Sequence, residues 1–158
     1  MLQDILLKVV ADYLVIPIIL TGGIVLLLVP AKQRYVVWAR AVLTGLTALL
    51  FAKIISLLYQ GERPFETMGV DPGAAFLPNP GFPSDHALLV FTVTVVVWAV
   101  TKNKALGGIL LAASIAVAVG RVLALVHTPL DVVGGAFCAI LAAACIYGRQ
   151  FFTTRRQI

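Results

Sequence analysis

The sequence predicts an all-α integral membrane protein, a bundle of about five transmembrane helices. Hydrophobic residues make up 61% of the 158 residues and charged residues only 12%, and the mean hydropathy is +1.02. Soluble domains are about half apolar and about a quarter charged, so we expect lipid to be the main solvent. The apolar residues also fall into runs of about 20, the length that a helix needs to cross a bilayer.

Five apolar runs predict the membrane-spanning helices, at about 9–30, 41–59, 86–101, 105–126 and 129–147. Residues 1–8 form a helical extension, an interfacial turn or a sixth, short helix. The one long connection, 60–85, is rich in proline and glycine and cannot be a helix interior. We expect a single domain over 1–158, in which the 60–85 loop connects spans on the outer face, where most of the polar chemistry is found.

The positions of the basic residues predict the orientation. Under this topology eight of them share one side, in the first loop, between the third and fourth spans, and in the tail: Lys32, Arg34, Arg40, Lys102, Lys104, Arg149, Arg155 and Arg156. The positive-inside rule makes that side cytoplasmic. The N-terminus is therefore predicted outside and the C-terminus in the cytoplasm, in a multi-pass protein of the cell membrane.

Charge and composition also exclude some functions. The net charge of +5 does not indicate nucleic-acid binding, because the basic residues are scattered between apolar runs. No set of Cys, His and carboxylates has metal-ligand spacing, so we expect no metal and no other cofactor. Small residues at every fourth position, from Gly108 to Gly120 and from Gly135 to Ala143, predict close helix packing.

Three polar clusters are expected to meet at the outer boundary of the bilayer, although they lie far apart in the sequence. They are Gly61-Glu62-Arg63-Pro64, then Phe82-Pro83-Ser84-Asp85-His86, then Gly120-Arg121 with His127 and Asp131. Both histidines of the chain belong to these clusters.

Two of the clusters contain predicted helix starts. Ser84 stands at an N-cap position, which leaves the amides of Asp85 and His86 unpaired and outward. Thr128 is a second N-cap, and Pro129 suits the first helical position after it. Two helix N-termini at one membrane face favour the binding of an anion.

The charged side chains of the clusters suit phosphate. Arg63 and Arg121 are planar donors that bind phosphate oxygens in pairs, and a neutral His beside a carboxylate is a tuned nucleophile or base. Arg121 lies in an apolar stretch, where ionisable residues are usually functional. Each residue taken alone has a structural alternative. Arg63 could be a boundary residue whose side chain reaches the membrane interface, and Asp131 could be only a helix cap. A single His at a membrane boundary is more often structural than catalytic.

Together the clusters resemble the signature of the type 2 phosphatidic acid phosphatase family, which includes membrane lipid phosphatases. That signature is Lys, six residues, Arg-Pro; then Pro-Ser-Gly-His; then Ser-Arg, five residues, His, three residues, Asp. The matching positions lie within roughly 40–147, and they are Arg63-Pro64, Pro83-Ser84 with His86, and Arg121, His127 and Asp131.

The chain departs from the signature in three places. Ser56 stands where the family has Lys, and Lys53, one helical turn deeper, is either the displaced phosphate-binding Lys or a residue that only reaches the interface. Asp85 replaces Gly, and this Pro-Ser-Asp-His form resembles the bacitracin-resistance type of undecaprenyl-diphosphate phosphatase. Gly120 replaces Ser, which removes a hydroxyl contact.

The resemblance implies a metal-independent phosphatase that works through a phosphohistidine. His127 would be the nucleophile, Asp131 would orient it, and His86 would protonate the leaving oxygen. The residues that would bind phosphate are Arg63, Arg121, Ser84, Asp85 and Lys53. The expected substrate is undecaprenyl diphosphate or a similar polyprenyl diphosphate, and the alternative is phosphatidylglycerophosphate or phosphatidate.

A function of another class stays open. A small transporter or scaffold could use the same outer cluster only to bind an anionic lipid headgroup, without hydrolysis. Phosphate release by the purified protein separates the two classes. The sequence predicts membrane lipids as partners and does not predict an oligomeric state.

Overall fold

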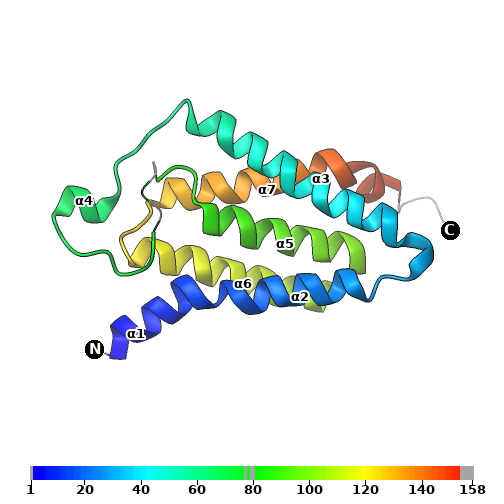
Figure 1. Cartoon of the computed structure of the whole chain (residues 1–158), viewed down its shortest axis with the longest axis horizontal. Helices are drawn as coiled ribbons and strands as arrows, with labels where there is room; N and C mark the ends of the chain where they lie inside the picture. Colours follow the sequence, from blue (N-terminus) through cyan, green and yellow to red (C-terminus); the bar gives the residue numbers. More distant parts are fainter. Residues whose placement is uncertain (1, 77, 79–80, 154–158) are drawn as a thin grey trace.

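The structure is a computed structural model of the chain and describes residues 2–76, 78 and 81–153. Within those ranges it consists of helices and non-regular segments, with no strand. The long helices run side by side along the longest axis of the molecule (Figure 1). The all-α prediction is confirmed. Arg155 and Arg156 of the predicted basic tail lie outside the described residues.

The first helix begins earlier than predicted. α1 (Leu2–Lys8), the π-helix η1 (Val9–Tyr13) and α2 (Val15–Leu27) follow one another directly and form one apolar helix over Leu2–Leu27. Of the alternatives for 1–8, the helical extension is therefore correct for the described residues. The sequence offers no Gly or Pro before Pro17 that would separate the segments.

The second helix, α3 (Ala31–Ser56), corrects the prediction of a basic first loop. Lys32, Arg34 and Arg40 lie in its first turns and not in a loop, because Pro30 ends the turn and nothing in 31–40 breaks a helix. The Nε1 of Trp38 donates to the carbonyl of Leu26 at 2.9 Å and ties α3 to the end of α2.

The helix at the centre of the bundle is α5 (Asp85–Thr101), which contacts α2, α3, α6 (Lys104–Leu123) and α7 (Pro129–Thr153). It ends at Lys102, which adopts a left-handed conformation with φ 52°. With 17 residues α5 is short for a bilayer span, at roughly 25 Å. Four other helices in the described part of the chain are long and apolar enough to cross a membrane: Leu2–Leu27, Ala31–Ser56, Lys104–Leu123 and Pro129–Gly148.

Packing around α5 is close on the side of α7. A Cβ added at Gly135 would lie 2.6 Å from the carbonyl oxygen of Ser84 and 2.9 Å from the amide nitrogen of Leu88. Ala139 is fully buried as well, so the small-residue line of α7 packs as predicted. The line of α6 packs closely only in part, because Gly108 faces open space and Ala112 is exposed, whereas Gly120 meets the backbone of Ala11.

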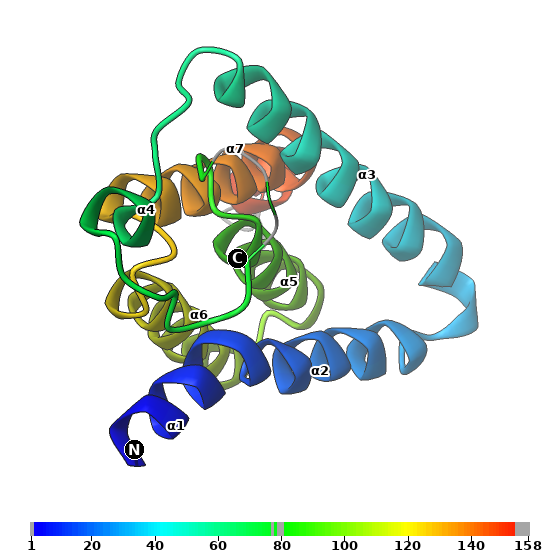
Figure 2. The same cartoon turned by 60° about the vertical axis from the view of Figure 1, so that its left-hand side comes forward.

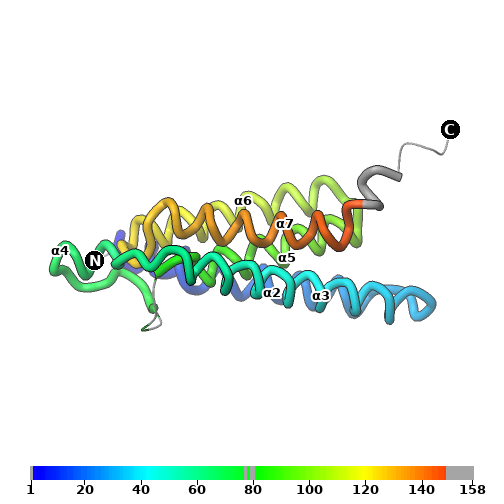
Figure 3. The backbone as a smooth tube through the Cα atoms, turned by 90° about the horizontal axis from the view of Figure 1, so that it is seen from above, coloured from blue at the N-terminus to red at the C-terminus, as the bar shows by residue number. Residues whose placement is uncertain are grey.

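The connections separate the two ends of the bundle. The N-terminus, α4 (Pro64–Met68) and the long loop lie at one end, and the turns after α2 and α5 lie at the other (Figure 1). α2 and α3 diverge from their shared turn (Figure 2). From above, α6 and α7 run together along one side and α2 and α3 along the other (Figure 3). The long loop thus faces the starts of α5 and α7.

Candidate active site

The long loop is fastened to the short segment between α6 and α7. The amide of Phe65 donates to the carbonyl of Leu125 at 3.0 Å, and the amide of Gly73 donates to the carbonyl of Ala124 at 3.0 Å. Leu125 adopts φ 59°, a conformation that is uncommon for residues other than glycine and that turns the chain after α6. These bonds place the first polar cluster of the sequence beside the third.

Arg63 lies at the start of α4 and is 97% buried, with 3% of its surface exposed. Its Nη1 donates to the carbonyl of Val126 at 2.7 Å. Burial lowers the pKa of the Arg63 guanidinium, and the carboxylates of Glu66, Asp131 and Asp85 oppose that effect. Arg63 is therefore a fixed cation inside the protein and does not reach for the interface, so the alternative of a boundary residue is wrong.

The two predicted N-caps are present. Ser84 precedes α5, and its Oγ accepts from the amide of Ala87 at 3.4 Å. The Oγ1 of Thr128 accepts from the amide of Asp131 at 3.2 Å, and Oδ2 of Asp131 accepts from the amide of Thr128 at 2.7 Å. The amide of Ser84 also donates to the carbonyl of Asp131 at 2.9 Å. This last bond holds the two helix starts against each other.

His127 and Asp131 face each other one turn apart. Nδ1 of His127 lies 3.5 Å from Oδ2 of Asp131, and both side chains are nearly fully buried. Within the described residues Nδ1 has no hydrogen-bond partner, because 3.5 Å exceeds the usual limit of about 3.2 Å. Catalytic hydrogen bonds are often long in empty sites and shorten on binding. Asp131 is thus both a helix cap and the carboxylate beside His127.

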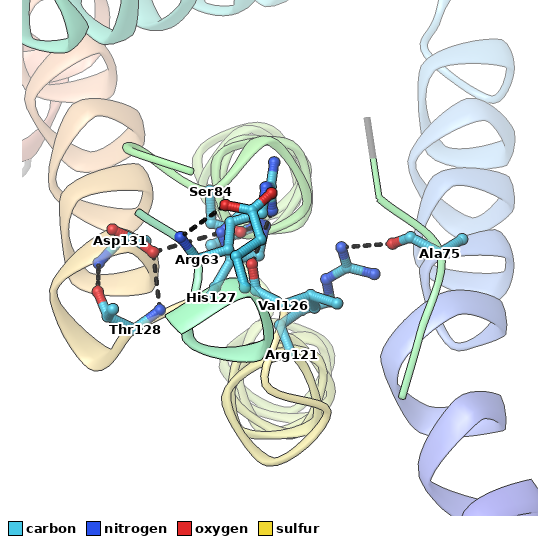
Figure 4. A network of polar contacts seen from close by, with 10 residues as sticks. Arg63, Ala75, Ser84, Arg121, Val126, His127, Thr128 and Asp131 are labelled. Atoms are coloured by element: carbon cyan, nitrogen blue, oxygen red, sulfur yellow. Dashed lines mark hydrogen bonds and ion pairs between the residues drawn. The ribbon is translucent and has the colours of Figure 1, made fainter. Parts of the chain in front are cut away.

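The three clusters share one cavity of about 160 Å³, and Figure 4 shows part of the polar network around it. Its lining residues are Arg63, Ala75, Phe76, Asp85, His86, Arg121 and His127. Asp85 is exposed and His86 is half-buried. Both histidines and both predicted arginines therefore meet at one small space, as the sequence analysis expected.

Arg121 has a partner that the sequence analysis missed. Its Nη1 lies 2.6 Å from Oδ1 of Asp12, which is on the π-helix η1. The carbonyl of Ala75 accepts from Nη2 of Arg121 at 2.7 Å. The signal for Asp12 was present, because an acidic residue within an apolar span is a functional candidate by default.

Lys53 does not line this cavity. It is exposed in the last turn of α3 and borders a second cavity of about 260 Å³, together with Ser56, Gln60 and Asp85. Asp85 belongs to both cavities. The structure therefore places five of the eight predicted site residues at this cavity, with Asp131 beside His127 and Ser84 hydrogen-bonded to Asp131. Lys53 lies in a neighbouring space.

Among the described residues no three His, Cys, Asp or Glu side chains are placed to hold a metal ion. The chemistry that these side chains offer is anion binding by two guanidinium groups, with an imidazole–carboxylate pair and a second imidazole at the same cavity. That combination suits the transfer of a phosphoryl group to a nitrogen nucleophile.

Comparison with known proteins identifies the family of the chain. The sequence model of the PAP2 superfamily matches residues 35–155. Bacitracin transport permease protein BcrC of Bacillus licheniformis is 31% identical over 108 residues, 68% of this chain and 52% of that protein. The chain thus spans about half the length of this relative. No solved structure matches significantly. Because the family model covers most of the chain, including most of α3, the loop, α5, α6 and α7, the chain belongs to the PAP2 superfamily.

Proposed function

We propose that this protein hydrolyses a lipid-linked phosphate, with a polyprenyl diphosphate such as undecaprenyl diphosphate as the substrate and the lipid monophosphate as the product. The observation that carries the proposal is the cavity that Arg63, Arg121, His86 and His127 line together. Membership of the PAP2 superfamily supports phosphate ester hydrolysis in general.

Binding of the phosphate would rest on groups that the fold already holds in place. The guanidinium groups of Arg63 and Arg121 are buried and hydrogen-bonded to carbonyls, so both cations are held in position before charge develops on the oxygens of the transition state. Ser84, the first-turn amides of α5 and, if it reaches across, Lys53 add further donors. Little reorganisation is needed when charge develops on the equatorial oxygens.

In the first chemical step His127 is the nucleophile. Asp131 favours the tautomer with the proton on Nδ1, which leaves the lone pair of Nε2 free to attack. The Nε2–phosphorus bond forms as the bond from phosphorus to the leaving oxygen breaks. The negative charge of the bound phosphate favours the imidazolium form of His86, which gives its proton to that oxygen, and the lipid monophosphate departs.

Water completes the cycle in the second step. His86 is now neutral and takes a proton from a water molecule that attacks phosphorus, while the bond to Nε2 breaks. Inorganic phosphate leaves, and His127 returns to its neutral form. Atoms and charges balance without a metal ion or any other cofactor.

The lipid chain has an apolar surface beside this cavity. A groove of about 320 Å³ runs between α5, α6 and α7 and is lined only by apolar residues, among them Val122 and Val132. Val122 follows Arg121 and Val132 follows Asp131 in the sequence. We assign the lipid chain of a phosphate bound in the cavity to this groove.

A direct comparison of substrates tests the proposal. We expect purified protein in detergent to release phosphate faster from undecaprenyl diphosphate than from phosphatidylglycerophosphate or phosphatidate. The Pro-Ser-Asp-His motif and the similarity to BcrC favour the first substrate. Faster turnover of either glycerophospholipid would contradict the assignment of the lipid, and no release from any of the three would contradict hydrolysis and favour a headgroup-binding protein.

A further inference from the structure

We propose that Asp12 is a positioning residue for Arg121, holding its guanidinium so that unused N–H groups meet the phosphate. This inference rests on the proposed function of the cavity. Asp12 precedes the region that matches the PAP2 superfamily, which begins at residue 35. It is therefore a feature of this chain that the family comparison does not supply.

The contacts form a closed ring of three residues. Oδ1 of Asp12 accepts from Nη1 of Arg121 at 2.6 Å, and Oδ2 accepts from the amide of Ala75 at 3.0 Å. The carbonyl of Ala75 accepts from Nη2 of Arg121 at 2.7 Å. Because each residue holds the other two, the guanidinium is fixed in position and orientation. Ala75 and Arg121 both line the cavity.

The ring leaves donors of Arg121 for a ligand. A guanidinium has five N–H groups, and two of them make the bonds to Asp12 and Ala75. Its Nε is buried and has no hydrogen-bond partner in the part of the chain that the structure describes. A buried donor without a partner is unfavourable, and a phosphate oxygen in the cavity would supply that partner.

Packing explains how Asp12 comes so close. A Cβ added at Gly120 would lie 3.2 Å from the Cα and the amide nitrogen of Ala11, so the glycine allows η1 to approach α6. Gly120 stands where the family signature has Ser. In η1 the amide of Leu14 bonds to the carbonyl of Val9, five residues back, and such π-turns occur frequently at functional sites. The wide turn and the missing side chain together bring Asp12 to Arg121.

A purely structural ion pair would predict a different outcome from a positioning residue. Removing Asp12 would then lower stability without a specific effect on turnover. If Asp12 acts through Arg121, its removal lowers kcat, and the loss disappears when Arg121 is already absent. A double-mutant cycle measures that dependence.

The experiment uses Asp12→Asn, Asp12→Ala and Asp12→Glu, with Asp4→Asn, an exposed acid on the same helix, as the control. We expect kcat/KM to fall about 10- to 100-fold in Asp12→Asn and Asp12→Ala, the loss seen when residues that orient the ligands of a metal site are replaced. Asp12→Glu should retain part of the wild-type kcat/KM. Asp4→Asn should match the wild type. In an Arg121→Ala background, Asp12→Ala should change turnover less than about threefold.

The inference would be overturned if Asp12→Ala lowered kcat/KM by the same factor in the wild-type and Arg121→Ala backgrounds. Wild-type turnover in Asp12→Asn would also overturn it. Thermal unfolding curves separate a loss of turnover from a folding defect. If Asp12→Ala alone does not fold, the double variant Asp12→Ala/Arg121→Ala removes the unpaired buried charge of Arg121 as well. An inactive wild-type protein would contradict the proposed function instead. In that case weaker vanadate binding by Asp12→Asn would support the positioning role, and unchanged binding would overturn it.

Discussion

The carboxylate of Asp131 has two tasks at the residue scale. It accepts from the amide of Thr128 at 2.7 Å and lies 3.5 Å from Nδ1 of His127. The helix cap thereby fixes the position of the carboxylate, which in the proposed mechanism orients the imidazole. The sequence left these roles as alternatives, whereas the geometry is compatible with both at once.

Asp131→Asn separates the two roles. We expect the amide to retain the cap, since its oxygen still accepts from Thr128, but to lose the charge that stabilises the His127 imidazolium-like transition state. kcat should fall by about 100- to 10,000-fold, while thermal stability changes little. Steady-state phosphate release and unfolding curves on the same preparation test this. Activity near the wild-type level would remove Asp131 from the mechanism.

Lys53 provides a second test at this scale. If Lys53 extends from its own cavity toward the shared residue Asp85, Lys53→Met should weaken transition-state stabilisation by about 2–4 kcal/mol. Ser56→Lys should then recover part of kcat/KM, because Ser56 lines the same cavity as Lys53 and stands at the family position.

Lys102→Met is the control, at the turn between α5 and α6. Unchanged kcat/KM in Lys53→Met would leave phosphate binding to the two arginines and the helix amides.

Helix lengths were the least predictable feature at the element scale. The basic residues at 32, 34 and 40 suggested a loop. A fall in hydropathy does not by itself end a helix, however, and charged residues can continue a helix where water or lipid headgroups surround it. In contrast, the starts of α5 and α7 were predictable to within one residue. Ser84 and the Thr128-Pro129 pair are specific cap signals that act locally.

Gly135 tests the contact between those two helix starts. A Cβ there would lie 2.6 Å from the carbonyl oxygen of Ser84, so Gly135→Ala must push α5 away from α7. We expect a loss of about 1–3 kcal/mol in stability and a larger proportional loss of turnover, because Ser84 and Asp131 separate. Gly108→Ala, which faces open space, should be neutral in both. A stable, fully active Gly135→Ala protein would contradict the close packing of the site.

At the scale of the whole molecule, the order of the spans could predict that the three clusters converge. In a bundle whose helices alternate in direction, every second connection lies at the same end. The order of the spans could not predict the ring of Asp12, Ala75 and Arg121, since that contact depends on a π-turn and on how far two helices approach. Both are properties of packing between distant segments rather than of a local pattern.

The predicted orientation is open to a test independent of catalysis. In a protein without Cys138 and Cys145, a cysteine at Asp71 should react with a membrane-impermeant thiol reagent in intact cells. A cysteine at Lys102, at the opposite end of the bundle, should react only after the cells are opened. The positive-inside rule gives this expectation. The reverse pattern would place the cavity on the cytoplasmic side.

Trapping of the phosphorylated protein tests the central claim most directly. Purified protein is mixed with undecaprenyl diphosphate carrying a labelled terminal phosphate and quenched in base, where phosphohistidine survives. The account predicts label on the wild-type protein at His127, lost on acid treatment, and no label or phosphate release from His127→Ala that remains folded. Phosphate release by His127→Ala at the wild-type rate, or label on another residue, would contradict it.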